Sequence, residues 1–138
     1  MAVSLNHTIV HATDPRATAE FVTGVLGLDA PRRLAHFTVV QVGETSLDYV
    51  PAEGAVVPRH FAFLVGEAEF DAILDRIRAR GLTWWADPFR REAGEINRWD
   101  DGRGLYFADP DGHLLEIITR PYGSGGPGAM HPNPLLAL

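Results

Sequence analysis

The sequence predicts an α+β fold in which one β-α-β-β unit occurs twice. β-rich runs alternate with two helical segments, and each helical segment is followed by Gly-Leu, at Gly27-Leu28 and Gly81-Leu82. His7 precedes the first Gly-Leu by 20 residues, and His60 precedes the second by 21. The chain has 138 residues, enough for one domain with a core of its own. This repetition predicts a single domain with internal pseudo-twofold symmetry.

The first half of the chain shows a strand, a helix and then further strands. The β-run over 5–12 ends at Asp14-Pro15, where Asp is a good N-cap and Pro a good first helical residue. Apolar residues at helical spacing predict a helix over 15–26, which Gly27 ends. Two strands joined by a Gly43-Glu44 hairpin turn, and then a connector, are expected over 34–42, 45–50 and 51–58.

The second half repeats this order and adds a strand. A β-run covers 60–65, and the amphipathic pattern over 67–80 predicts a helix that stops at Gly81. Three later strands are expected over 82–89, 104–108 and 113–119. The Arg-rich loop over 90–103 and the turn over 109–112 connect them. We therefore expect one domain over 1–120, with modules 1–57 and 58–120, and a Gly/Pro-rich arm over 121–138.

Composition excludes several kinds of chemistry. The chain has no Cys, which removes disulfides, thiolate nucleophiles and Cys-ligated zinc. All 12 basic residues are Arg, so Schiff-base lysines and P-loops are excluded as well. A net charge of −6 argues against nucleic-acid or membrane partners. Neither a signal peptide nor a long apolar run is evident, which predicts a soluble cytoplasmic protein.

Strand alternation brings two histidines and one carboxylate into consideration as a site. Side chains alternate between the two faces of a strand, so His60 lies opposite the bulky Phe61 and Phe63. Glu116 is embedded in the apolar run Leu-Leu-Glu-Ile-Ile, where an acid is costly without a partner. Together with His7, these residues form a possible two-His, one-carboxylate metal set. The alternative is core histidines and a salt-bridged Glu, and the spacings of 53 and 56 residues carry no local signal.

Four motifs resemble the vicinal oxygen chelate superfamily, which includes glyoxalase I, fosfomycin-resistance thiol transferases, extradiol dioxygenases and bleomycin-binding proteins. They span about residues 4–120, and the last is the most specific. The motifs are Asn6-His7-Thr8-Ile9-Val10, Val25-Leu26-Gly27-Leu28, His60-Phe61-Ala62-Phe63 and Tyr106-Phe107-Ala108-Asp109-Pro110-Asp111-Gly112-His113-Leu114-Leu115-Glu116. The resemblance implies paired βαβββ modules that form an open, cupped mixed sheet with helices on the outer face.

The resemblance also implies a divalent metal ion per site, one of Fe, Mn, Ni, Zn or Co, bound by His7, His60 and Glu116. Asp48 falls where glyoxalase I usually has a Glu ligand, and is a candidate ligand or catalytic base. Tyr106 falls ten residues before Glu116, where some branches have a substrate-contacting tyrosine. The implied function is a metal-dependent enzyme acting on a small oxygen-chelating substrate. Isomerase, lyase, thiol transferase and dioxygenase reactions remain open.

Some residues depart from the patterns of particular branches of the superfamily, and these branches fit the sequence less well. Ile9 stands where the fosfomycin-resistance pattern has Thr, and that pattern's lysine has no counterpart here. The usual dioxygenases carry two such domains, which fits 138 residues poorly. The alternative is a drug-sequestering resistance protein of the bleomycin type. In both cases we expect a homodimer, and the candidate substrate or drug contacts are His11, Trp84, Trp99, Arg98 and Arg103. For Trp84 the alternative is strand packing.

Overall fold

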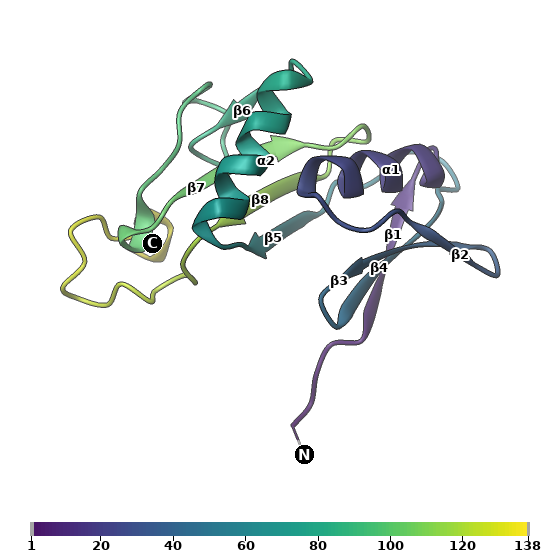
Figure 1. The fold of residues 1–138 in the computed structure, drawn as a ribbon, viewed down its shortest axis with the longest axis horizontal. Helices are drawn as coiled ribbons and strands as arrows, with labels where there is room; N and C mark the ends of the chain where they lie inside the picture. Colours follow the sequence, from purple (N-terminus) through teal and green to yellow (C-terminus); the bar gives the residue numbers. More distant parts are fainter. Residues whose placement is uncertain (1, 138) are drawn as a thin grey trace. The chain divides into compact units, whose positions relative to one another are not determined.

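The computed structural model describes residues 2–137. The chain divides into two compact units. The first unit runs to Pro58 and includes Asp109–Gly112, and the second consists of Arg59–Ala108 and the chain from His113 onward. Each unit is described separately below, and the elements are labelled in Figure 1. Within residues 2–137, no helix is long and apolar enough to cross a membrane.

The first unit is a four-stranded mixed sheet with one helix against it (Figure 1). Strands β1 and β4 are parallel neighbours, whereas β4, β3 and β2 are antiparallel, giving the order β1-β4-β3-β2. Helix α1 begins after Asp14, whose side chain accepts a hydrogen bond from Ala17 N at 3.1 Å. The elements are β1 (His7–Ala12), α1 (Pro15–Leu26), β2 (Arg32–Leu34), β3 (Phe37–Val42) and β4 (Thr45–Pro51).

The second unit has the same topology, with the strand order β5-β8-β7-β6 and helix α2 against the sheet. Strands β5 and β8 are parallel, and the other pairs are antiparallel. The α+β class and the repeated βαβββ unit are therefore confirmed. The elements are β5 (His60–Leu64), α2 (Glu67–Ala79), β6 (Trp84–Trp85), the 3-10 helix η1 (Trp99–Asp101), β7 (Gly104–Ala108), β8 (Leu114–Ile118) and the 3-10 helix η2 (Pro134–Ala137).

Two strand boundaries differ from the sequence prediction. The run expected as one strand over 34–42 is divided between β2 and β3, with a tight turn in which Ala35 has a φ of 53°. The strand expected over 82–89 shrinks to Trp84–Trp85. There the Asp87 carboxylate accepts hydrogen bonds from the backbone N–H groups of Phe89, Arg91 and Glu92, which turns the chain away from the sheet.

The cores follow the predicted alternation and helical spacing. Helix α1 buries small side chains, including Val22 and Val25, whereas α2 buries large ones, including Phe70 and Ile73. On β1 the side chains alternate from exposed His7 to buried Val10 and Ala12. Each sheet therefore has one face sealed by its helix, and the histidine that begins β1 or β5 is exposed.

Candidate metal centre

His60 and Glu116 come together because β5 and β8 are parallel neighbours. The register pairs His60 with Leu114 and places Glu116 opposite Ala62. His60 Nδ1 lies 3.0 Å from the Leu114 carbonyl oxygen, which can only accept, so Nδ1 carries the hydrogen. His60 Nε2 lies 3.1 Å from Glu116 Oε1. The imidazole is thus held through Nδ1, with Nε2 directed at the carboxylate, the arrangement typical of metal-binding histidines.

Glu116 is fully buried and is surrounded by hydroxyl groups. The Tyr122 hydroxyl lies 2.8 Å from Oε1 and 2.6 Å from Oε2, and the Tyr106 hydroxyl lies 2.8 Å from that of Tyr122. Burial raises the pKa of Glu116, and the hydrogen bonds from Tyr122, Tyr106 and His60 oppose this rise. Burial is also the main reason that the pKa of Tyr106 is raised, so Tyr106 stays protonated and acts as a donor.

The chemistry of this pair fits a divalent metal. Imidazole nitrogen and carboxylate oxygen are common donors to first-row ions, with bonds of ~2.0–2.2 Å. Two such donors at right angles around one ion are ~3 Å apart, and His60 Nε2 and Glu116 Oε1 are separated by 3.1 Å. In residues 2–137, neither unit contains three His, Asp or Glu side chains that lie close enough together to hold a metal ion. The second unit therefore supplies two donors of a potential site.

The first unit contains three further residues predicted for the site, and these make other contacts. His7 is exposed, and its Nδ1 lies 2.7 Å from Asn6 Oδ1. Asp48 lies opposite Ile9 in the β1–β4 register, is 8% exposed and accepts a hydrogen bond from the Ser46 hydroxyl at 2.8 Å. His11 lies on the same exposed face of β1 as His7.

Two of the expected contact residues lie near the His60–Glu116 pair, and one lies elsewhere. Tyr106 is directly opposite Glu116 on β7, and its ring is stacked 5.9 Å from that of His60. Trp99 meets Tyr106 edge to face at 6.2 Å. Trp84 instead lies under the guanidinium of Arg78 from α2, at 5.5 Å, which corresponds to the strand-packing alternative.

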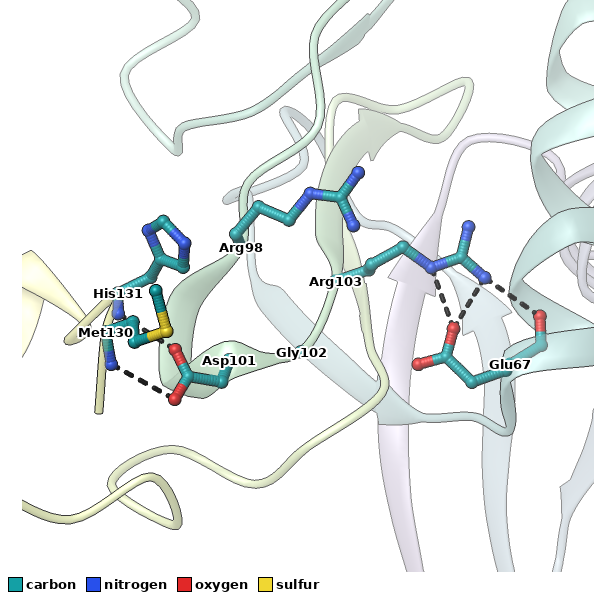
Figure 2. A pocket seen from close by; sticks show the side chains of 7 residues that line it. All are labelled: Glu67, Arg98, Asp101, Gly102, Arg103, Met130 and His131. Carbon is teal, nitrogen blue, oxygen red and sulfur yellow. Dashed lines mark hydrogen bonds and ion pairs between the residues drawn. The ribbon is translucent and has the colours of Figure 1, made fainter. Parts of the chain in front are cut away.

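The two expected arginines line a pocket of about 310 Å³ that Figure 2 shows from close by. Arg103 is engaged within the fold, since it binds Glu67 at 2.6 Å and Asp71 at 2.7 Å and lies 4.3 Å over the Phe70 ring. Hydrogen bonds to Asp71 and Glu67 raise the pKa of Arg103 further. Arg98 extends into the same pocket (Figure 2).

Sequence reasoning missed Tyr122, which binds Glu116, and Asn133, which lies beside Tyr122. Both lie in the region expected to be an arm outside the core. Asn133 is only 4% exposed, and its side chain lies close enough to Tyr122 to lower the pKa of that hydroxyl. One signal was present, because Tyr122 follows the last strand after only four residues in a segment otherwise rich in Gly and Pro.

A family model for the "Glyoxalase/Bleomycin resistance protein/Dioxygenase superfamily" matches residues 4–117, which is most of the chain. The chain belongs to this superfamily. The resemblance noted from the four motifs is therefore confirmed.

Individual members of the superfamily resemble the chain to different degrees. The solved structure "Oxidase ChaP-H1" is 60% identical, with a TM-score of 0.87 over 88% of this chain and 99% of that one. "Oxidase ChaP-H2" is 55% identical, with a TM-score of 0.88 over 91% and 100% of the two chains. Glutathione transferase FosA of Serratia marcescens is 31% identical over 85% of this chain and 81% of its own. The chain is thus similar to two proteins named as oxidases over nearly their whole length.

Proposed function

We propose that this protein is a metal-dependent oxidase that acts on a small substrate with two adjacent oxygens. The observation that carries the proposal is the His60–Glu116 pair, in which a buried carboxylate oxygen and an oriented imidazole nitrogen lie 3.1 Å apart. Identities of 60% and 55% to proteins named as oxidases support this reaction class, against 31% to a glutathione transferase.

The motif resemblance predicts His7 as a third ligand, so the proposed donor types are two histidines and one carboxylate. This donor set is typical of non-haem Fe(II) enzymes that use oxygen, so we assign Fe(II) among the possible divalent ions. When bound, such an ion holds adjacent substrate oxygens and mediates electron transfer from substrate to O₂. The protein holds the ligands in place, since Leu114 O fixes the ring of His60 and the tyrosine hydroxyls fix Glu116.

An aromatic substrate such as a catechol fits the surroundings of the pair. The ring of Tyr106 lies beside that of His60, and Trp99 contacts Tyr106 edge to face. Trp99 also lines a pocket of about 610 Å³ with Phe89 and Leu135. Oxidation of a catechol to an o-quinone releases two electrons and two protons, and O₂ that accepts them becomes H₂O₂. Asp48, a buried carboxylate that accepts a hydrogen bond from the Ser46 hydroxyl, is our candidate base for one proton.

Thiol transfer is the second candidate, because FosA is 31% identical over most of both chains. The absence of lysine argues against it, since the fosfomycin-resistance pattern includes a lysine that this chain lacks. Incubation with Mn(II), glutathione and fosfomycin separates the two reactions. Formation of the glutathione adduct would contradict the oxidase proposal.

We also propose a homodimer. Ile9 on β1 is 48% exposed and Leu64 on β5 is 62% exposed, and both strands are at a sheet edge. Exposed apolar groups on unpaired edge strands favour coverage by another chain. Light scattering after size exclusion should give twice the chain mass of 15.1 kDa.

The oxidase proposal is tested with metal-free protein loaded anaerobically with Fe(II), Mn(II) or Zn(II). We expect one metal ion per chain after gel filtration. With a panel of catechols, O₂ uptake and H₂O₂ release should require Fe(II) and be absent with Zn(II), which cannot change oxidation state. Failure of the native protein to retain any of these ions would refute the metal proposal, and equal turnover with Zn(II) would refute the redox role.

Matched variants assign the ligands. His60→Ala, His7→Ala and Glu116→Gln should each lose metal retention and O₂ uptake. His36→Ala is the control, because His36 is an exposed histidine whose ring packs on Phe37 at 4.1 Å. Asp48→Asn should retain the metal and lose O₂ uptake if Asp48 is the base.

A further inference from the structure

The C-terminal strap, residues 121–137, is fastened to the second unit by two consecutive aspartates. The Asp100 carboxylate accepts hydrogen bonds from the backbone N–H groups of Gly123 at 3.0 Å and Gly125 at 3.2 Å. Asp101 accepts from Met130 at 3.1 Å and His131 at 2.9 Å, as Figure 2 shows. The strap lies beyond residues 4–117, the part of the chain that the family model matches.

The backbone at this fastening is unusual. Asp100 and Asp101 both have positive φ values, 57° and 60°, which non-glycine residues rarely adopt. Asp100 is 3% exposed, and its own N–H donates to His131 O at 2.7 Å. Two adjacent residues in this conformation persist only where the surrounding contacts fix them. The strap is therefore held in a defined place by built contacts.

The strap brings the Tyr122 hydroxyl to Glu116 and places Asn133 beside Tyr122. The Tyr122 hydroxyl lies within 2.8 Å of both carboxylate oxygens, and it has one hydrogen to donate. Its distance to Oε2 is shorter, 2.6 Å, whereas Oε1 is the oxygen that faces His60 Nε2. Asn133 Oδ1 accepts from Leu135 N, while its buried Nδ2 has no hydrogen-bond partner within residues 2–137.

We propose that Tyr122 is a positioning residue for the metal site and that the strap is required to seat it. The inference rests on the metal proposed above. By donating toward Oε2, Tyr122 fixes the rotation of the Glu116 carboxylate and leaves Oε1 directed at the position shared with His60. Outer hydrogen-bond partners of this kind typically contribute 10–100-fold to metal affinity.

The experiment titrates full-length, metal-free protein with Mn(II) and measures free Mn(II) by electron paramagnetic resonance. Tyr122→Phe should weaken Mn(II) binding by ~10-fold or more, and should change the zero-field splitting of bound Mn(II), which reports ligand geometry. Tyr49→Phe is the matched control, because it removes a hydroxyl from a tyrosine that is 1% exposed in the first unit. It should bind Mn(II) like the native protein.

A second pair of variants tests the strap without altering Tyr122. A Cβ at Gly125 would lie 2.8 Å from Ala129 Cβ and 3.0 Å from Asp100 Cα, so Gly125→Ala should push the strap away from Asp100. A Cβ at Gly128 meets nothing within 4 Å. We expect Gly125→Ala to weaken Mn(II) binding several-fold and Gly128→Ala to leave it unchanged. If Tyr122→Phe fails to fold, these two glycine variants still test whether the strap is required for Mn(II) binding.

Contrary outcomes are distinct from failure of the metal proposal. If native protein binds no Mn(II) or Fe(II), the metal proposal itself is wrong. If native protein binds Mn(II) and both Tyr122→Phe and Gly125→Ala bind it equally well, only the role of the strap is refuted. A tyrosinate charge-transfer band in Fe(III)-loaded protein that Tyr122→Phe removes would make Tyr122 a direct ligand and overturn its positioning role.

Discussion

The two units share one topology, yet the histidine and the carboxylate are in contact only in the second unit. In each unit a histidine begins the edge strand, and a carboxylate lies on the neighbouring parallel strand, opposite the residue two positions later. In the second unit His60 and Glu116 are bonded at 3.1 Å. In the first unit His7 contacts Asn6, and Asp48 contacts Ser46.

The two units share a strand register, so other features explain why only the second brings its histidine and carboxylate into contact. Glu is longer than Asp by one methylene, which lets the carboxylate of Glu116 extend to His60. The second unit also carries the C-terminal strap, whose Tyr122 binds both oxygens of Glu116. Register alone supplies the positions, and side-chain length together with an added segment supplies the contact.

The largest expected effect is a difference in stability between core variants of the two units. Phe70→Ala in α2 removes a fully buried aromatic ring and should lower the free energy of unfolding by ~3–5 kcal/mol. Val22→Ala in α1 removes two buried methyl groups and should lower it by about 1.5 kcal/mol. Chemical denaturation monitored by circular dichroism measures both. Equal losses would mean that the two helices contribute alike despite their different side chains.

Shortening the carboxylate of the second unit should make it behave like the first. Glu116→Asp should weaken Mn(II) binding at least ~100-fold, since the carboxylate can no longer reach both His60 and Tyr122. Asp48→Asn should leave Mn(II) affinity unchanged. Titration of free Mn(II) checks both variants. A comparable loss in Asp48→Asn would make Asp48 a fourth ligand.

The smallest effect concerns pH and the strap. Backbone N–H groups of Met130 and His131 hold the pKa of Asp101 below its usual range. A carboxyl whose pKa is lowered in the folded state stabilises it above the unfolded pKa of ~3.9, and this stabilisation is lost as the pH falls through the folded value. Hydrogen exchange at Met130 and His131 should therefore accelerate below pH ~4. Asp101→Asn should exchange rapidly already at neutral pH and should show no such acid transition.

Sequence reasoning recovered the repeated unit because its signals are local. Helical spacing, Gly27 and Gly81 as stop signals, and the Asp14-Pro15 start all depend on neighbouring residues. It overestimated the strand over 82–89, because Asp87 binds backbone groups two to five residues later and ends the strand. Strand alternation and the parallel register together put Glu116 on the face of His60, where the two side chains lie 3.1 Å apart.

The sequence by itself determined the α+β class, the internal repeat, the absence of cysteine and lysine side chains, and the donor types available for a metal. Only the tertiary structure decided that Glu116 is fully buried, that Tyr122 binds it, and that Arg103 is engaged by Glu67 and Asp71. Periodicity identifies which face of a strand a residue occupies. It cannot show which distant segment covers that face, because such contacts depend on how the chain returns in space.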